Sequence, residues 1–406
     1  MRATEPHRTA VDAAFARWVP GHALPQAFYT DESIYRADLE AVWFRHWIWV
    51  GHSSQLAGAG DFLRFDVDRE SVLVVRGQDG ELRAFANVCP HRGSRVCLDH
   101  GGKASGFTCP YHAWRFNLSG ELLSRRAMPA DFAPTEHGLT RLPLLEFQGL
   151  LFVSFSDDPP PLAAALAPIA SLCEPFDFRA LKVAHSAVYP VEANWKLALE
   201  NYLECYHCAP SHRDYARSHS LKDPVSVAQL APSLAARSAA VGVPTREHSA
   251  CGTDATHPAC SVYYRRYPLY DGFETGSETG ASVAPTLGTL TGRDGGATDL
   301  QTGVLNNFLV YSDHMVGYRF IPTGPDTTDI HTVWLVNADA VAGVDYDLDA
   351  LCWLWHRTTL DDERIIRHNQ AGVRSRFYRP GPLSDMEWGI VDFYAGYFGD
   401  LGLTSW

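Results

Sequence analysis

Glu200, Glu204, His207 and His212 are residue types that bind metal ions, and they lie close together in the sequence. The chain from 194 to 209 contains no Gly or Pro, which predicts a single helix over this stretch. Spacings of four and three residues would place Glu200, Glu204 and His207 on one helical face. The proline that follows would let the chain turn so that His212 approaches His207. These residues could therefore form a metal site.

Two imidazoles that converge on one point, with a carboxylate from elsewhere, are the ligand set of a non-haem iron(II) site. Such a site keeps open positions for dioxygen. A buried face with carboxylates and an imidazole is also unfavourable unless a cation satisfies it. The alternative is a capped core helix that carries a chance pair of histidines. This stretch alone leaves both interpretations open.

A second group of metal-binding residue types has the pattern Cys89-x-His91, seventeen intervening residues, then Cys109-x-x-His112. Two thiolates and two imidazoles can hold a Rieske [2Fe–2S] cluster, with the cysteines on one iron and the histidines on the other. The alternative is a zinc Cys2His2 site. Zinc modules usually begin with two cysteines that are about two to four residues apart, so the spacing favours the cluster.

These cysteine–histidine pairs lie among short stretches with the patterns of β-hairpins. Val72–Val75 and Leu82–Phe85 flank Asp79-Gly80, a dipeptide typical of tight hairpin turns. A second hairpin is expected with its turn at Ser119-Gly120. The Pro-rich stretch 157–161 would end any strand ladder, and it predicts a domain boundary.

The rest of the chain mixes helices and strands. The sequence predicts helices within the first 44 residues, over 161–173 and over 348–373, and strands over 181–189, 307–321 and 329–337. The segment 218–300 is rich in Gly, Ser, Thr and Pro. A long loop in a compact domain is more often functional than idle, so we expect a lid or mouth over a pocket.

The composition describes a globular protein with ample material for a large core. The 406 residues are 46% hydrophobic and 20% charged, and no apolar run is long enough to span a bilayer. A net charge of −13 argues against nucleic acid as a partner and favours cationic small molecules or a basic protein. The nine cysteines favour a reducing compartment with metal ligation over a disulfide framework. We expect a cytoplasmic protein without a secretion signal.

Together, the two cysteine–histidine pairs and the Glu204-x-x-His207-x4-His212 stretch resemble the catalytic (alpha) subunit of the Rieske non-haem iron oxygenases. The resemblance covers nearly the whole chain and implies an α+β fold. That fold has an N-terminal all-β Rieske [2Fe–2S] domain plus a C-terminal helix-grip domain, an antiparallel sheet with helices, for mononuclear iron. The expected domains are an N-terminal helical segment packing on the catalytic domain (1–44), the Rieske domain (45–158) and the catalytic domain (159–406).

The same resemblance implies which residue supplies the missing carboxylate. In the family, a late acidic helix carries an Asp eight residues before a Gln-x-Gly, and counting back from Gln370 selects Asp362. Asp362 would then join His207 and His212 as the third iron ligand. Composition alone would describe Asp361, Asp362 and their neighbours as solvent-facing charges paired with arginines, so this choice depends on the resemblance.

Glu204 has two possible roles at this centre. It could be a fourth iron ligand, or it could bridge His112 of one subunit to His207 of the next along the electron path, as the resemblance implies. In the family the cluster and the iron of one subunit are too far apart for efficient transfer, so an oligomer is required. The resemblance implies a homotrimer. Asn201 is a further expected catalytic residue.

The resemblance also implies the reaction and the partners. The chain would be a terminal oxygenase that uses O2 and electrons from NAD(P)H, delivered by a separate reductase with or without a ferredoxin. No G-x-G-x-x-G nucleotide fingerprint follows a strand, which is consistent with an external reductase.

The substrate prediction depends on Glu204, because many ring-hydroxylating members carry Asp there. With Glu at this position, the chain resembles the subgroup that oxidises quaternary ammonium compounds such as betaine, carnitine and stachydrine. We predict monooxygenation or oxidative N-demethylation of such a compound, and the alternative is mono- or dihydroxylation of an aromatic acid. Aromatic residues within 263–267 and 388–397 could face a methylammonium cation, line an aromatic-substrate pocket or belong to the core.

Three other interpretations were open from the sequence. A Rieske ferredoxin would leave the large second domain unexplained, and a zinc-stabilised binding protein would contain no cluster. Cys205-x-x-Cys208 could be a thioredoxin-type redox pair, although no βα motif precedes it.

Overall fold

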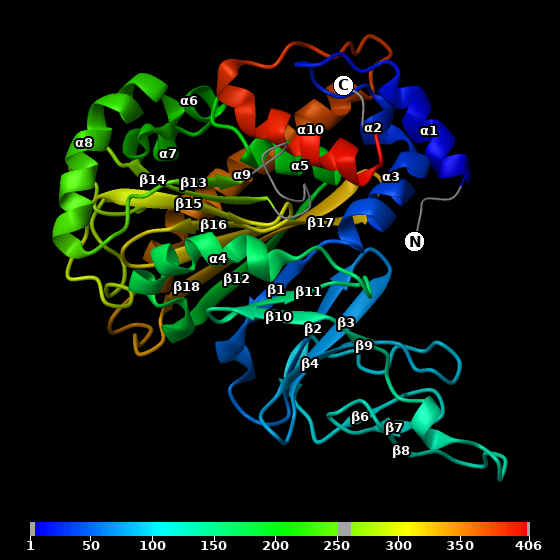
Figure 1. Cartoon of the computed structure of the whole chain (residues 1–406). Coiled ribbons are helices and arrows are strands. Elements are labelled where there is room, and N and C mark those ends of the chain that lie inside the picture. The colour runs from blue at the N-terminus through cyan, green and yellow to red at the C-terminus, as the bar shows by residue number, and fades with distance from the viewer. Residues whose placement is uncertain (1–4, 251–260, 404–406) are drawn as a thin grey trace. The chain divides into compact units, whose positions relative to one another are not determined.

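The computed structural model describes residues 5–250 and 261–403, and it divides into two compact units (Figure 1). One unit is 47–159, and the other combines 1–46 with 160–406. No helix in the described part of the chain is long and apolar enough to cross a membrane. The expected α+β fold, with an all-β unit and a second unit of helices on an antiparallel sheet, is confirmed.

The unit of 47–159 is built from short antiparallel strands. Its sheets have the orders β5-β2-β3-β4-β9, β1-β11-β10 and β6-β7-β8. Both predicted hairpins are present, since Asp79-Gly80 joins β3 to β4 and Ser119-Gly120 joins β7 to β8. The strands are β1 (Ile48–His52), β2 (Asp61–Val67), β3 (Glu70–Arg76), β4 (Leu82–Ala86), β5 (Gly101–Lys103), β6 (Phe107–Thr108), β7 (Arg115–Phe116), β8 (Leu122–Ser124), β9 (Arg141–Leu142), β10 (Leu144–Phe147) and β11 (Leu150–Val153).

The other unit is organised around an antiparallel sheet that has seven strands in the described residues, in the order β12-β18-β17-β16-β15-β14-β13. The central strands are almost entirely buried, as their β-branched and aromatic composition favours. A hairpin joins β17 to β18, with Pro325-Asp326 at its turn. The strands are β12 (Leu181–Val191), β13 (His248–Ala250), β14 (Val262–Pro268), β15 (Gly296–Thr302), β16 (Asn307–Val310), β17 (Met315–Gly324) and β18 (Thr327–Asn337).

Helices of this unit pack on the sheet, and Figure 1 shows α5, α9 and α10 along one of its faces. The N-cap side chains of Asn194 and Asp347 begin α5 and α9, because each accepts a hydrogen bond from a backbone amide of the first turn. The helices are α1 (Glu5–Phe15), α2 (Ala27–Thr30), α3 (Glu32–Asp38), α4 (Leu162–Cys173), α5 (Trp195–Tyr202), α6 (Cys208–Ser211), α7 (Arg213–Ser218), α8 (Pro224–Val241), α9 (Leu348–Val373) and α10 (Trp388–Asp400).

Two predictions about these elements were wrong. The segment 218–300 is not one long loop, because it contains α8, β13, β14 and the start of β15. The helix expected over 194–209 ends at Tyr202, and a turn over 203–207 separates it from α6. The expectation of a lid over the pocket stays a prediction, and part of that segment, 251–260, lies outside the described residues.

Candidate metal centres

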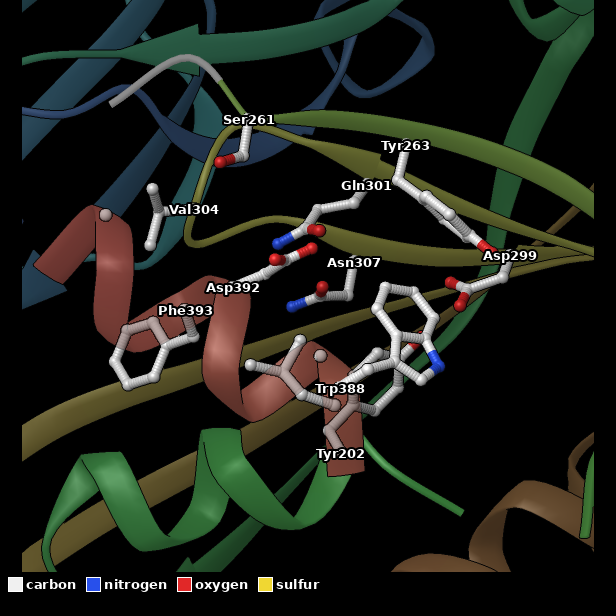
Figure 2. A pocket seen from close by; sticks show the side chains of 13 residues that line it. Tyr202, Ser261, Tyr263, Asp299, Gln301, Val304, Asn307, Trp388, Asp392 and Phe393 are labelled. Carbon is white, nitrogen blue, oxygen red and sulfur yellow. The ribbon is translucent and has the colours of Figure 1, made fainter. Parts of the chain in front are cut away.

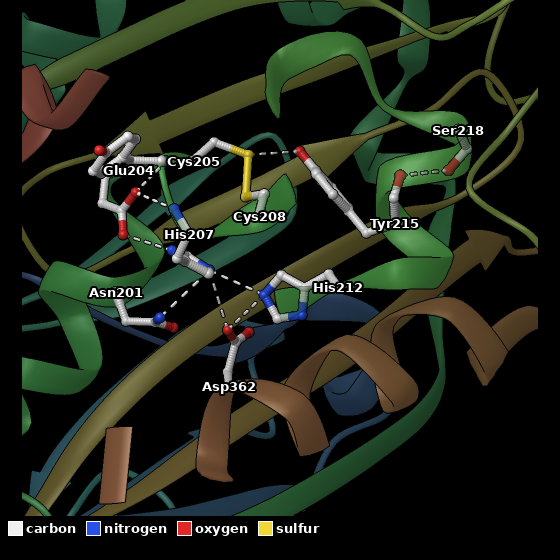
Figure 3. Close-up of a disulfide and its surroundings, with 10 residues drawn as sticks. Asn201, Glu204, Cys205, His207, Cys208, His212, Tyr215, Ser218 and Asp362 are labelled. Carbon is white, nitrogen blue, oxygen red and sulfur yellow. Dashed lines mark hydrogen bonds and ion pairs between the residues drawn. A yellow bond between two sulfur atoms is a disulfide. The ribbon is translucent and has the colours of Figure 1, made fainter. Parts of the chain in front are cut away.

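Three predicted ligands converge in the unit that contains the large sheet. The Nε2 atoms of His207 and His212 are 3.0 Å apart, and Asp362 Oδ1 lies 3.4 Å from the first and 2.9 Å from the second (Figure 3). The three side chains offer ligand atoms that all lie within 4.8 Å of one another. His212 is buried, whereas His207 and Asp362 are partly accessible.

These side chains come from segments that are distant in the sequence. His207 follows the turn after α5, His212 follows α6, and Asp362 lies in the middle of α9. A hydrogen bond from the backbone N–H of Asn194 to Gln370 Oε1, 2.8 Å long, connects the start of α5 to α9. This contact fixes α5, which precedes the turn that carries His207, against α9, which carries Asp362.

The packing of α9 distinguishes Asp362 from its neighbour. Asp362 Oδ1 approaches the Nε2 atoms of both histidines, which are the atoms that face each other. Asp361 instead approaches His212 Nδ1, on the other side of that ring, at 3.6 Å, and its side chain is 40% exposed. The arrangement therefore favours Asp362 as the third ligand.

The electrostatics of this group suit a cation. Burial by itself would lower the pKa of His207, but hydrogen bonds to Asp362 and Glu204 raise it to about 9. Burial would raise the pKa of Asp362, but the two histidines lower it. Two imidazole nitrogens that point at each other need a shared proton or a metal ion between them. Two imidazoles and one carboxylate are a donor set that fits mononuclear iron(II) and leaves coordination positions free.

Glu204 lies against the outer nitrogen of His207 rather than among the converging atoms. Its Oε1 is 2.5 Å from His207 Nδ1, and its Oε2 accepts a hydrogen bond of 3.2 Å from the backbone N–H of His207. A carboxylate in this position fixes the orientation of a metal-binding imidazole and leaves Nε2 free for the metal. Asn201 is on the other side of the ring, where its Nδ2 lies 3.4 Å from His207 Nε2.

Glu200 does not share a face with Glu204 and His207, so that prediction was wrong. Because α5 ends at Tyr202, the spacing of 200, 204 and 207 no longer follows one helix. The Glu200 carboxylate is buried and accepts hydrogen bonds of 3.1 and 3.0 Å from the Tyr29 hydroxyl. Burial raises the pKa of Glu200 to about 8, although hydrogen bonds from Tyr29 and Tyr394 oppose the rise.

A disulfide joins Cys205 and Cys208 on either side of His207. The sequence interpretation favoured metal ligation over disulfides and considered a Cys205-x-x-Cys208 redox pair only as an alternative. The hydroxyl of Tyr215 on α7 lies 3.6 Å from Cys205 Sγ, and Figure 3 shows the pair beside the converging ligands. The bond ties the turn that carries His207 to the first turn of α6.

The second candidate centre is in the unit of 47–159. The Cys89 and Cys109 thiols are free and buried, and the His91 and His112 rings lie with their centroids 4.7 Å apart. Backbone hydrogen bonds close each loop, from the Gly93 amide to Cys89 O (2.9 Å) and from the amide of residue 113 to Cys109 O (3.0 Å). These turns bring the two cysteine–histidine pairs together.

The donor atoms of this second group fit an iron–sulfur cluster. The Nδ1 atoms of His91 and His112 are buried without a hydrogen-bond partner among the described residues, as expected of metal-directed nitrogens. Burial raises the pKa of the Cys89 thiol, whereas backbone amides of Tyr111 and His112 offset burial at Cys109 and lower its pKa. Two thiolates and two imidazoles match the ligand set of a Rieske [2Fe–2S] cluster.

A cavity of about 50 Å³ lies beside α5 in the larger unit, and sequence reasoning named few of its residues. Figure 2 shows aromatic rings and carboxylates around it, including Tyr202, Tyr263, Trp388, Asp299 and Asp392. None of the described residues that line it is Lys, Arg or His. Asp299 carries no motif, so only the strand pairing of β14, β15 and β16 could have revealed it.

Comparisons with known proteins cover both units. A family model described as the Rieske [2Fe-2S] domain matches residues 46–143, and one described as the ring hydroxylating alpha subunit (catalytic domain) matches 178–397. The glycine betaine monooxygenase oxygenase subunit of Pseudomonas aeruginosa (strain UCBPP-PA14) is 33% identical over 97% of this chain and 92% of that protein. The carnitine monooxygenase oxygenase subunit of Escherichia coli (strain K12) is 38% identical over 48% of this chain and 53% of that protein. A solved quaternary ammonium Rieske monooxygenase, studied for carnitine oxidation and inter-subunit electron transfer, matches with a TM-score of 0.70 and 25% identity over 94% of both chains.

Proposed function

This chain belongs to the ring-hydroxylating oxygenase alpha subunits, and on that basis we propose that it is the terminal oxygenase of a system that oxidises a quaternary ammonium compound. It is a Rieske non-haem iron oxygenase, an oxidoreductase whose cofactors are a [2Fe–2S] cluster and mononuclear iron, with O2 as co-substrate. A separate NAD(P)H-dependent reductase, with or without a ferredoxin, would supply the electrons.

The residues described above take specific roles in this proposal. Cys89, Cys109 and the histidines beside them would hold the cluster, and His207, His212 and Asp362 would hold the iron. When bound, the iron supplies the activation of dioxygen. Glu204 would keep the His207 ring in its ligating orientation through the contact of 2.5 Å to Nδ1.

The observation that carries the substrate class is the charge and ring content of the cavity beside α5. Its lining combines Tyr202, Tyr263 and Trp388 with the carboxylates of Asp299 and Asp392, and it contains no cationic side chain among the described residues. A methylammonium group is stabilised by aromatic faces and by negative charge. An aromatic acid brings a carboxylate that finds no cationic partner there and, unlike a betaine, brings no positive charge to pair with the carboxylates of the cavity. The full-length similarity to a glycine betaine monooxygenase subunit supports the same class.

The proposed reaction inserts one atom of O2 into a C–H bond next to the quaternary nitrogen. The other oxygen atom leaves as water, which takes two electrons from the reductase and two protons. Hydroxylation of a methyl group on the nitrogen gives a hydroxymethyl group, which releases formaldehyde and leaves a tertiary amine. Hydroxylation at another carbon gives a hydroxylated product instead.

A substrate-dependent oxygen-uptake assay tests this function. The purified oxygenase, a generic NADH-dependent reductase and each candidate substrate are combined, and O2 consumption and products are measured. We expect glycine betaine, carnitine or stachydrine to stimulate uptake and to give formaldehyde or a hydroxylated product, while benzoate and phenylpropanoids do not. Coupled formation of a hydroxylated arene or a cis-dihydrodiol, without turnover of any betaine, would establish ring hydroxylation of an aromatic acid instead.

We also propose that the active species is a homotrimer in the cytoplasm. Family membership supports this assembly, together with the inter-subunit electron transfer described for the related quaternary ammonium monooxygenase. In a closed ring, Glu204 would connect His207 of one protomer to the cluster of the next. Light scattering after size exclusion should give three times the mass of 44.9 kDa, and a fully active monomer would contradict the proposal.

A further inference from the structure

Strand register places a row of polar side chains on the face of the sheet that borders the cavity. Tyr263 on β14 pairs with Gln301 on β15, which pairs with Asn307 on β16. Partners in antiparallel strands share a face, and so do residues two apart along one strand. Asp299 therefore lies on the same face as Gln301, and all four residues line the cavity.

The Asp299 carboxylate has no partner of its own among the described residues. The residue opposite it on β14 is Arg265, but that guanidinium bonds Glu247 Oε1 at 2.9 Å and lies over the Tyr267 ring, 4.9 Å from its centroid. Burial raises the pKa of Asp299 to about 7. Asp299 is partly buried, and a partly buried carboxylate without a partner is unfavourable, so a cationic ligand would compensate it.

Aromatic side chains surround this carboxylate. Burial raises the pKa of Tyr202, Tyr215 and Tyr267, and the negative charge of Asp299 raises each further, which places it near all three phenols. Figure 2 shows Asp299 beside Trp388, whose ring centroid is 5.5 Å from that of Tyr263. The rings come from α5, α7, β14 and α10, so they enclose the carboxylate from several sides.

This group of rings also contacts the candidate iron centre. The Tyr215 ring lies 6.3 Å from the ring of His212, centroid to centroid, in an edge-to-face arrangement. Tyr202 directly follows Asn201, which faces His207 Nε2. The rings near Asp299 therefore include one that packs against a candidate iron ligand.

We propose that Asp299 is the residue that selects a cationic substrate, an inference that rests on the proposed function. Its carboxylate would pair with the quaternary nitrogen inside a cage formed by Tyr202, Tyr263 and Trp388. The rings exclude water and offer their π faces to the methyl groups. The carboxylate supplies the charge that distinguishes a quaternary nitrogen from a carbon of the same shape. Asp392, on α10, also lines the cavity, but Figure 2 shows it away from Asp299, beside Gln301 and Asn307.

The test compares a cation with its neutral isostere. Glycine betaine and 3,3-dimethylbutanoate share their shape and their carboxylate, and they differ in the charge at the branched centre. Binding of each to the full-length holoenzyme is measured by calorimetry for the wild type, Asp299→Asn and Asp329→Asn. Asp329 on β18 is a matched control, because it is a half-buried aspartate of the same sheet whose pKa is also raised by burial, and it does not line the cavity.

We expect the wild type and Asp329→Asn to prefer glycine betaine to the isostere by about tenfold or more, as a charge pair in a partly enclosed site implies. Asp299→Asn should lose this preference through weaker binding of betaine, with binding of the isostere unchanged. Its melting temperature should be equal to or higher than that of the wild type, because a partly buried charge without a partner has been removed. A carboxylate with a structural role would give a lower melting temperature instead.

The outcomes separate this inference from the proposed function. If the wild type binds no betaine, carnitine or stachydrine, the proposed function fails and the inference fails with it. If the wild type prefers betaine and Asp299→Asn keeps that preference, only the inference is overturned. Should the variant be insoluble, wild-type calorimetry in buffers of different ionisation enthalpy still decides, since betaine binding at pH 7 should release protons from Asp299 and isostere binding should not. Equal proton release for both ligands would overturn the inference.

Discussion

The ion pair between Asp38 and Lys196 tests how α5, the helix before the turn that carries His207, is anchored. Both side chains are fully buried, and Lys196 is the second residue of α5. The Asp38 carboxylate also accepts hydrogen bonds from Trp195 Nε1 (3.1 Å) and from the Tyr397 hydroxyl (2.5 Å). The pair therefore joins α3, α5 and α10 in the core of the larger unit.

Desolvation dominates the energetics of this pair. Burial raises the pKa of Asp38 even though Lys196 lowers it, and burial lowers the pKa of Lys196 even though Asp38 raises it. The cost of removing both charges from water thus exceeds their attraction, so replacing the whole pair need not destabilise the fold. Removing one partner leaves the other charge buried alone, which typically costs about 3–5 kcal/mol.

We predict that Lys196→Met and Asp38→Asn each lower the free energy of unfolding by about 3–5 kcal/mol. The double variant should lie within about 1–2 kcal/mol of the wild type, because its amide oxygen can accept from Trp195 Nε1 while its NH2 donates to the Tyr397 hydroxyl oxygen, and no charge remains. The resulting coupling energy of about 3 kcal/mol or more is measured by a double-mutant cycle in denaturant. Thermal unfolding of each single variant should shift downward by at least about 5 °C.

Two controls accompany this prediction. Glu32→Gln removes an exposed charge of the neighbouring α3 pair with Arg36 and should change stability by less than about 0.5 kcal/mol. Visible absorption of the cluster should persist in all variants, since the cluster belongs to the other unit. Additive single-variant effects, or single losses below about 1 kcal/mol, would refute the argument that burial makes each charge depend on the other.

Four further predictions concern the metal centres and the cavity. His91→Ala should abolish the visible and EPR signals of the Rieske cluster and leave the larger unit folded by circular dichroism; a retained spectrum would contradict the ligand assignment. Asp362→Ala should lose mononuclear iron, measured by metal analysis, and keep the cluster spectrum, whereas Asp361→Ala should keep both; the reverse result would move the ligand by one residue. Glu204→Gln should retain both metal contents but slow cluster oxidation in single turnover by orders of magnitude, and a normal rate would exclude the bridging role. Because the pKa of Asp299 is raised to about 7, affinity for glycine betaine should fall as pH falls through 7, by about tenfold between pH 8 and pH 6; a flat calorimetric profile would argue against charge pairing.

The sequence by itself predicted the features that depend on local pattern. The helix expected over 348–373 matches α9 at both ends, because its N-cap Asp347 and its apolar periodicity are local signals. The hairpin at Asp79-Gly80 was likewise encoded by a turn that only a few residue types adopt, with Gly80 at a φ of +83°. The spacing of Cys89, His91, Cys109 and His112 indicated a cluster before any fold was known.

Tertiary contacts decided the features that spacing could not. An uninterrupted helix from 194 to 209 was reasonable on local signals, yet α5 ends at Tyr202. Gly389 of α10 packs so closely on the backbone of Leu203 that a Cβ there would lie 2.3 Å from the Leu203 carbonyl oxygen. The buried environment of Glu200 similarly depends on Tyr29, which is 171 residues away in sequence.

The same distinction applies to the candidate site. Asp361 and Asp362 are adjacent and chemically identical, and only the orientation of α9 directs Asp362 toward both histidines. Asp299 belongs to no motif, and its environment arises from β14 and β16, together with rings from α5, α7 and α10. Candidate metal-binding residues can be recognised from residue type and spacing, which are properties of the sequence. Burial and charge pairing arise only where distant segments meet in the folded protein.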